Sequence, residues 1–165
     1  MIKLYENEIK KAWLNMISQE MIEAMANNGL SFEGGNDHYG NSYGQGGMVQ
    51  GDRLLEYFTP IIEKDFGCKI AKENSYSRIY FNGSTLKPHI DRPGLDITLS
   101  LCAYSDIETE WPLCVHDGQQ VHILATPPGT AAAMLGTKHV HWRDPLVCRD
   151  DQKVIQVFCH WRILS

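Results

Sequence analysis

Two short segments of the chain combine imidazole and carboxylate side chains. Residues 87–93 read KPHIDRP, in which His89 and Asp91 stand two residues apart. In an extended strand, residues two apart point to the same side. Residues 139–143 read HVHWR and supply two more imidazoles, His139 and His141, which also share a strand face. Together the two segments predict a metal site that is built from histidines and one aspartate.

Two imidazoles and one carboxylate on one face of an octahedral metal form the facial triad of non-haem Fe(II) oxygenases. This ligand set leaves three coordination positions open for a co-substrate and O₂. We expect His89, Asp91 and His141 to be the ligands, with His139 as the alternative distal histidine. The remaining histidines are interpreted as surface residues of loops and strands: His38, His116, His122 and His160.

A lysine opens the last predicted strand. Lys153 shares one side of that strand with Ile155, Val157 and Cys159. A cation on an apolar face is costly unless it is paired with an anion, so we interpret Lys153 as an anion binder beside the metal. The alternative is a lysine at the strand end that faces solvent, which is the usual position of lysine.

Hydrophobic periodicity predicts helices first and strands later. Residues 6–26 and 52–66 carry apolar residues at three- and four-residue steps, and Asp52 is expected to cap the second helix. The glycine-rich residues 33–51 predict a long loop, either a lid over the site or a disordered surface loop.

From about residue 74, β-branched and aromatic runs alternate with turn signals. This pattern predicts strands at 76–81, 95–104, 112–115, 120–125, 130–135, 137–142 and 153–162. We therefore expect an α+β protein whose sandwich or jelly roll is braced by the N-terminal helices.

Composition excludes several classes of protein. The chain has 165 residues, enough for one domain, and a net charge of −5 with no basic stripe, so no nucleic-acid partner is expected. No apolar run is long enough to cross a bilayer and no signal-peptide core precedes the first predicted helix, so the expected location is cytoplasmic. Five cysteines without a CxxC pair argue against disulfides and a structural zinc site.

These residues resemble the 2-oxoglutarate and Fe(II)-dependent dioxygenases, most closely the prolyl-4-hydroxylase-like branch. The family pattern is an HxD motif, a distal histidine some fifty or more residues later, and a basic residue about ten further on. Here it falls on His89, Asp91, His141 and Lys153, with Tyr80 where the family often has a tyrosine nine residues before the motif. The resemblance covers about residues 74–162, including the stretch PPGTAAAMLGTKHVHWRDP.

The resemblance implies a double-stranded β-helix (jelly roll) over residues 74–165, with residues 1–73 as helical support and lid loop. It implies that Lys153 and Tyr80 bind the far carboxylate of 2-oxoglutarate. Because the spacing from His141 to Lys153 is slightly long, Arg143 or Arg149 is the alternative. The implied reaction hydroxylates a C–H bond of a peptide residue or a small amino-acid-like substrate, and converts 2-oxoglutarate and O₂ to succinate and CO₂.

Two other readings stay open at this point. A jelly-roll module without redox chemistry could hold zinc through His89, His139 and His141. A nucleic-acid demethylase of the same superfamily fits poorly, because its paired arginines are missing from KVIQVFCHWR. Arg92 and Arg143, beside the expected ligands, could meet a substrate carboxylate, or instead pair with Asp96 and Asp144.

Overall fold

A computed structural model describes residues 1–34 and 39–165. It contains two helices, α1 (Lys11–Ala26) and α2 (Val49–Phe66), among mostly antiparallel strands. The early strands are β1 (Ile2–Tyr5), β2 (Ser31–Phe32), β3 (Ser42–Gly46), β4 (Ile70–Tyr80) and β5 (Leu86–His89). The later strands are β6 (Ile97–Ser105), β7 (Leu113–His116), β8 (Val121–Leu124), β9 (Ala131–Met134), β10 (Val140–Arg143) and β11 (Val154–Ile163).

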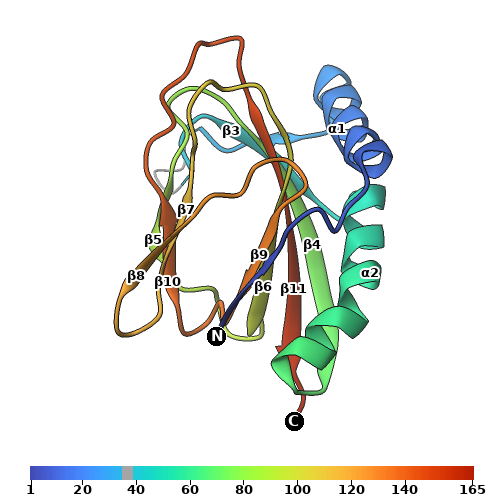
Figure 1. Cartoon of the computed structure of the whole chain (residues 1–165). Coiled ribbons are helices and arrows are strands. Elements are labelled where there is room, and N and C mark those ends of the chain that lie inside the picture. Colours follow the sequence, from blue (N-terminus) through green and yellow to red (C-terminus); the bar gives the residue numbers. More distant parts are fainter. Residues whose placement is uncertain (35–38) are drawn as a thin grey trace.

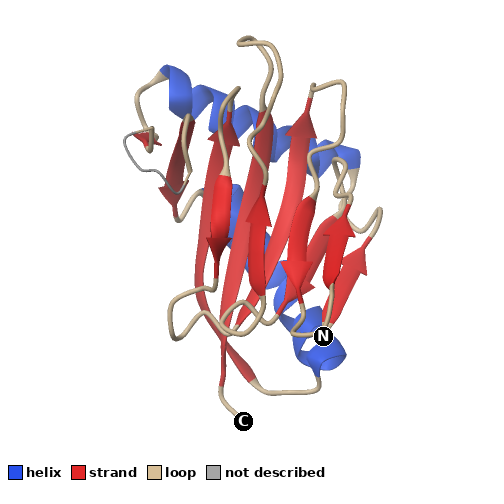
Figure 2. Ribbon diagram, turned by 90° about the vertical axis from the view of Figure 1, so that its left-hand side faces the viewer, coloured by secondary structure: helices blue, strands red, loops and turns tan. Residues whose placement is uncertain are grey.

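The strands form two sheets. A seven-stranded sheet has the order β1-β9-β6-β11-β4-β3-β2, and a four-stranded sheet has the order β5-β10-β7-β8. Figure 1 shows three layers, with the small sheet, the large sheet and the two helices following one another across the molecule. In Figure 2 the small sheet lies in front and the helices lie behind the large sheet. The expected packing of the N-terminal helices on one sheet is therefore confirmed.

The two faces of the large sheet have different neighbours. Along β11, Ile155, Val157, Cys159 and Trp161 are buried in the apolar core that the sheet shares with the helices. The intervening residues, among them Gln156 and Phe158, point to the other face, toward the small sheet, because side chains alternate along a strand. A residue of β11 that belongs to a site between the sheets must therefore be on the side of Gln156 and Phe158, and not on the side of Ile155 and Val157.

Several expected boundaries differ from the structure. The first helix starts later than residue 6, because residues 2–5 pair with β9 as an edge strand. The second starts at Val49, so the prediction of Asp52 as its cap is wrong. The Asp52 carboxylate instead accepts a hydrogen bond from the Ser75 hydroxyl at 2.6 Å, which ties α2 to β4.

The predicted loop over residues 33–51 is also only partly a loop. Residues 42–46 form β3 and pair with β4, although the glycines suggested no strand. Residues 35–38, with His38, lie outside the part of the chain that the structure describes. Neither described helix is long and apolar enough to cross a membrane.

Candidate metal centre

Three of the predicted ligands converge at one mouth of the space between the sheets. His89 ends β5 and lies opposite His141 on β10, and Asp91 follows two residues after β5. One ligand atom from each residue lies within 4.8 Å of the other two. The Asp91 Oδ1 atom is 3.4 Å from the Nε2 atoms of both histidines. Two ligands at right angles about 2.1 Å from one ion would lie roughly 3 Å apart, so the spacing suits a shared metal.

Both imidazoles are oriented by backbone carbonyl groups. Nδ1 of His89 is 2.7 Å from the Lys87 carbonyl oxygen, and Nδ1 of His141 is 2.8 Å from that of His139. A carbonyl oxygen only accepts hydrogen bonds, so each Nδ1 carries the proton. In both rings Nε2 faces Asp91 and is the nitrogen left to bind a metal, which is the orientation that a metal ligand needs.

The Asp91 carboxylate is fixed from the other side. Its backbone N–H donates to the Gly136 carbonyl at 2.8 Å, and its Oδ2 accepts a hydrogen bond from the Thr98 hydroxyl. Burial raises the pKa of Asp91, but in the metal-free site its contacts with the His141 and His89 side chains outweigh burial and hold that pKa well below its ordinary value. The group is therefore an anion, as a hard metal ligand should be.

His139 does not join this group. The three-residue set contains His141, so between the two candidate distal histidines the geometry selects His141. The His139 side chain is buried, and its Nδ1 atom has no hydrogen-bond partner among the described residues. The three-histidine zinc site is consequently not assembled within the described part of the chain.

The triad lines a pocket of about 420 Å³ between the sheets. A buried ion pair forms one wall, in which Arg78 Nη2 is 3.2 Å from the Glu33 carboxylate and the guanidinium stacks on the Tyr39 ring at 3.8 Å. His160 also lines the pocket, contrary to its interpretation as a surface histidine, and its Nδ1 is 2.6 Å from the Asn74 side-chain oxygen. Burial lowers the pKa of His160 to about 4.

The structure does not bring Lys153 to the triad. Its predicted strand partners Ile155, Val157 and Cys159 do share its side of β11, but that side packs against the helices. The Lys153 ammonium lies 5.7 Å from the centre of the Tyr104 ring. Lys153, like Arg143 and Tyr80, is not among the residues that line the triad pocket. The prediction identified the correct alternation but assigned the wrong face to the metal.

Arg143 lies on the inward face instead, two residues after His141 on β10. It is 1% exposed and donates a hydrogen bond to the Trp111 carbonyl at 2.6 Å. Its Nε has no partner, and no carboxylate among the described residues pairs with it. Burial lowers the pKa of Arg143. A buried cation without a counter-ion is costly, so the site fits a group that brings an anion.

Tyr80 is fully buried at the same end of the space between the sheets. Its hydroxyl accepts a hydrogen bond from Arg78 Nη1 at 3.1 Å, and its ring packs edge-on against Trp111. Because an arginine can only donate, the Tyr80 proton is free to be donated to an acceptor. Arg149, the other candidate, is 63% exposed and paired with Glu108 and Asp151, so it lies outside the site.

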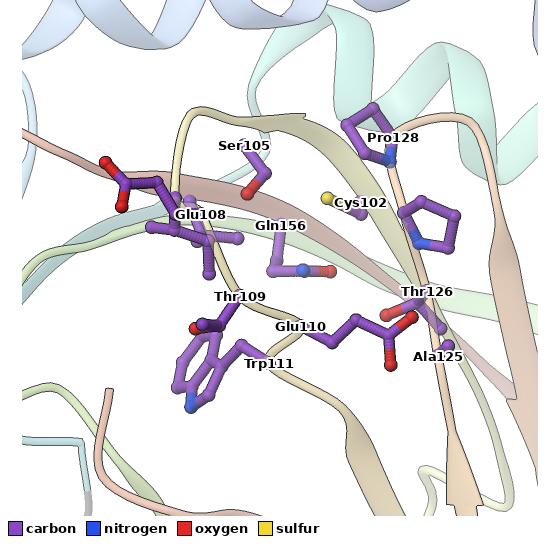
Figure 3. Close-up of a pocket in the computed structure, with 13 residues that line it drawn as sticks. Cys102, Ser105, Glu108, Thr109, Glu110, Trp111, Ala125, Thr126, Pro128 and Gln156 are labelled. Atoms are coloured by element: carbon purple, nitrogen blue, oxygen red, sulfur yellow. The ribbon is translucent and has the colours of Figure 1, made fainter. Parts of the chain in front are cut away.

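A second pocket, of about 260 Å³, opens at the end of the sheets away from the triad. Figure 3 shows Gln156, Cys102 and Thr126 around it, with Trp111 and Glu110 on the loop before β7. Trp111 contacts Arg143, and Gln156 lies 3.4 Å from the Ser100 hydroxyl of the triad pocket. Gln156 thus links the two pockets, and Arg143 and Tyr80 both contact Trp111 of the second one.

The sequence patterns missed several residues of the triad pocket. Arg78 precedes Tyr80 by two residues in YSRIYF, so strand alternation could have placed both on one face. Glu33, Thr98 and Gly136 reach the site only through the fold, because no local pattern relates them to the histidines.

Comparison with known proteins adds a common architecture. No family model and no curated protein matches the sequence. Among solved structures, a prolyl-4-hydroxylase from Pseudomonas putida superposes with a TM-score of 0.75 at 12% identity, covering 99% of this chain and 93% of that one. A Trichoplax adhaerens prolyl hydroxylase in complex with a hypoxia-inducible-factor peptide gives 0.73 at 11%, covering 98% and 83%.

A non-haem α-ketoglutarate-dependent carbocyclase from nogalamycin biosynthesis gives a TM-score of 0.75 at 9% identity, covering 98% of this chain and 79% of that one. The chain therefore has the fold of the 2-oxoglutarate and Fe(II) oxygenases, including the prolyl-4-hydroxylase-like branch. The resemblance inferred from the sequence is confirmed at the level of fold.

Proposed function

We propose that this protein is an Fe(II)- and 2-oxoglutarate-dependent dioxygenase that hydroxylates a C–H bond of its substrate. The convergence of His89, Asp91 and His141, with both Nε2 lone pairs directed at one point beside the carboxylate, carries the proposal. Two nitrogen donors and one oxygen donor are the set that non-haem Fe(II) enzymes use, and the open side of the triad faces the pocket.

The strand order supports a double-stranded β-helix in a single domain. From β4 to β11 the chain alternates between the sheets, with one exception where β7 and β8 pair within the small sheet. This winding is the one expected of a jelly roll. It places the ends of β5 and β10 side by side, which brings the two halves of the ligand set together across a long sequence separation.

Arg143 and Tyr80 are proposed to bind the far carboxylate of 2-oxoglutarate, in place of Lys153. Residues two apart on a strand are about 6.6 Å apart along it, so an extended five-carbon dicarboxylate could bridge from the ion at His141 toward the Arg143 guanidinium. The orphaned Nε of Arg143 and the free proton of Tyr80 are two donors for that carboxylate. Charge-assisted hydrogen bonds of this kind are about twice as strong as neutral ones.

When bound, the iron and 2-oxoglutarate would supply the activation of O₂, with release of succinate and CO₂. The residues of the chain have simpler roles. His89, Asp91 and His141 would hold the ion, and Thr98 and Gly136 hold Asp91 in place. The buried layer formed by Arg143 and Tyr80 would orient the dicarboxylate and exclude water from one side. The pocket face opposite that layer is left for the substrate.

The substrate is proposed to be either a peptide residue or a small molecule. The neighbours of similar fold include a prolyl hydroxylase with a bound peptide and a carbocyclase of antibiotic biosynthesis, so the fold accommodates both classes.

Anaerobic titration with Fe(II) and 2-oxoglutarate tests the proposal. We expect a weak visible charge-transfer band that needs both additions and is absent from the Asp91→Ala variant. The His139→Ala variant is the matched control, since His139 lies beside the site but contributes no ligand atom, and it should keep the band. Tight Zn(II) binding without any band would instead favour the non-redox metal-binding module.

A further inference from the structure

One charged side chain of the triad pocket, Arg92, is neither paired within the described residues nor used by the proposed chemistry. Arg92 directly follows Asp91, lines the pocket and is exposed at its mouth. Its side chain makes no hydrogen bond or ion pair with any residue of the described ranges 1–34 and 39–165. The anticipated partner Asp96 is engaged elsewhere, because its Oδ2 accepts the Ile163 N–H at 2.8 Å.

The backbone holds Arg92 in place. The Arg92 carbonyl accepts a hydrogen bond from the Leu95 N–H at 3.2 Å, which closes a four-residue turn over Arg92, Pro93, Gly94 and Leu95. Gly94 has a φ of +98°, and proline followed by such a glycine is the sequence of a type II turn. Asp91 is itself fixed by Gly136 and Thr98, so the backbone of Arg92 is held in one position beside the proposed metal ligands.

The remaining charges of the pocket cancel. Arg78 is neutralised by Glu33, and both of these side chains are largely buried. A dication held by Asp91 and carrying the two carboxylates of 2-oxoglutarate has one net negative charge, which the Arg143 guanidinium offsets. Arg92 is then the unmatched positive charge at the end of the pocket that stays open to the substrate, and a substrate that complements it carries an anion.

Resting on the proposed function, we propose that the substrate is a small carboxylate-bearing molecule, and that Arg92 binds its carboxylate beside the metal. A guanidinium matches the two oxygens of a carboxylate in a bidentate pair. The pocket volume of about 420 Å³ suits a small molecule. Leu95, Phe158 and the Tyr39 and Tyr76 rings line the same pocket and can pack against an apolar body.

Binding of matched ligand pairs tests this assignment without any turnover. The probes are small carboxylates and their neutral amides: phenylacetate, N-acetylglycine and N-acetylproline, each with the corresponding amide. NMR of the arginine side-chain N–H signals of metal-free protein follows the titration, and the Arg92 signal is identified by its loss in Arg92→Lys. We expect a saturable shift of that signal with at least one carboxylate and none with its amide. No saturable shift with any carboxylate, or equal shifts with an amide, would overturn the assignment.

Turnover in the loaded enzyme provides the second measurement. For substrates that stimulate 2-oxoglutarate consumption, Arg92→Met should raise the substrate KM about tenfold to a hundredfold, the range for a hydrogen bond to a charged group, with kcat little changed. Lys138→Met is the matched control, because Lys138 is an exposed cation in the turn before β10 that does not line the pocket. It should leave KM unchanged.

The outcomes separate this inference from the proposed function. A missing charge-transfer band refutes the dioxygenase proposal, whereas the NMR titration of metal-free protein still reports on Arg92. A normal band together with a substrate whose KM is the same in Arg92→Met and wild type refutes the inference alone. Stimulation by an internal prolyl residue of a peptide, independent of Arg92, would do so as well and would assign a peptide substrate.

Discussion

Substitution of Gly136 by alanine should damage the proposed metal centre without changing any of its three proposed ligands. An added Cβ at Gly136 would overlap the Asp91 Oδ2 and Thr98 Oγ1 atoms and lie 3.1 Å from Asp91 Cγ. The backbone of Gly136 does not have the positive φ that only glycine tolerates, so the conflict is purely steric. Asp91 cannot move aside freely, because its own N–H is bound to the Gly136 carbonyl at 2.8 Å.

The size of the effect follows from what must move. The carboxylate has to leave the Thr98 hydroxyl or change its 3.4 Å approach to the two imidazoles. Loss of a group that orients a ligand typically lowers metal affinity by about 10–100-fold, which is about 1.4–2.7 kcal/mol. Inserting one methyl group into a filled site costs about 1–3 kcal/mol, so the metal-free Gly136→Ala protein should also lose that much free energy of unfolding.

Anaerobic calorimetric titration with Fe(II), and urea unfolding of the metal-free protein, measure the two quantities. Gly46→Ala is the control. The nearest atom to its added Cβ would be in the Tyr76 ring, at 3.5 Å, which is an ordinary van der Waals contact. It should bind Fe(II) like the wild type. An Fe(II) affinity in Gly136→Ala within twofold of the wild-type value would show that the position of Asp91 does not depend on this close approach.

Three further changes test other parts of the site. Arg143→Met should raise the Kd for 2-oxoglutarate at least tenfold in anaerobic calorimetry, because it removes the buried cation. Lys153→Met should leave that Kd unchanged, and the reverse result would return the role of carboxylate binder to Lys153. Glu33→Gln leaves Arg78 buried without a counter-ion and should lower the free energy of unfolding in urea by about 3–5 kcal/mol, whereas a loss below 1 kcal/mol would mean that the pair is solvated. The pKa of His160 is about 4 in the folded protein, below its ordinary 6.5. Between pH 6.5 and 4 the folded protein therefore binds fewer protons than the unfolded chain, and its free energy of unfolding falls as the pH drops. His160→Gln should flatten this fall in urea unfolding, and an unchanged slope would assign the pH dependence to other groups.

The convergence of the three proposed metal ligands could be predicted in part, because the placement of each depends on local geometry. The spacing of His89 and Asp91 needs only an extended backbone, and His141 follows from its place in a second extended segment. Even the choice between His139 and His141, however, required the pairing of β10 with β5, which sets His141 opposite His89. Register between strands so distant in sequence is a tertiary property, and neither HVHWR nor KPHIDRP encodes it alone.

The prediction of Lys153 as the anion-binding residue shows where such reasoning fails. Alternation correctly grouped Lys153 with Ile155 and Val157, but an alternating pattern does not tell which of two buried faces holds the ligand. Both faces of the large sheet are covered, one by the helices and the other by the small sheet, and the face toward the small sheet also carries polar residues such as Gln156 and His160. On such a strand, a lysine that shares a side with apolar residues can belong to the face that packs against the helices. The cation that points toward the small sheet's inner face is instead Arg143, which is on the same side of β10 as His141 because the two residues are two apart on that strand.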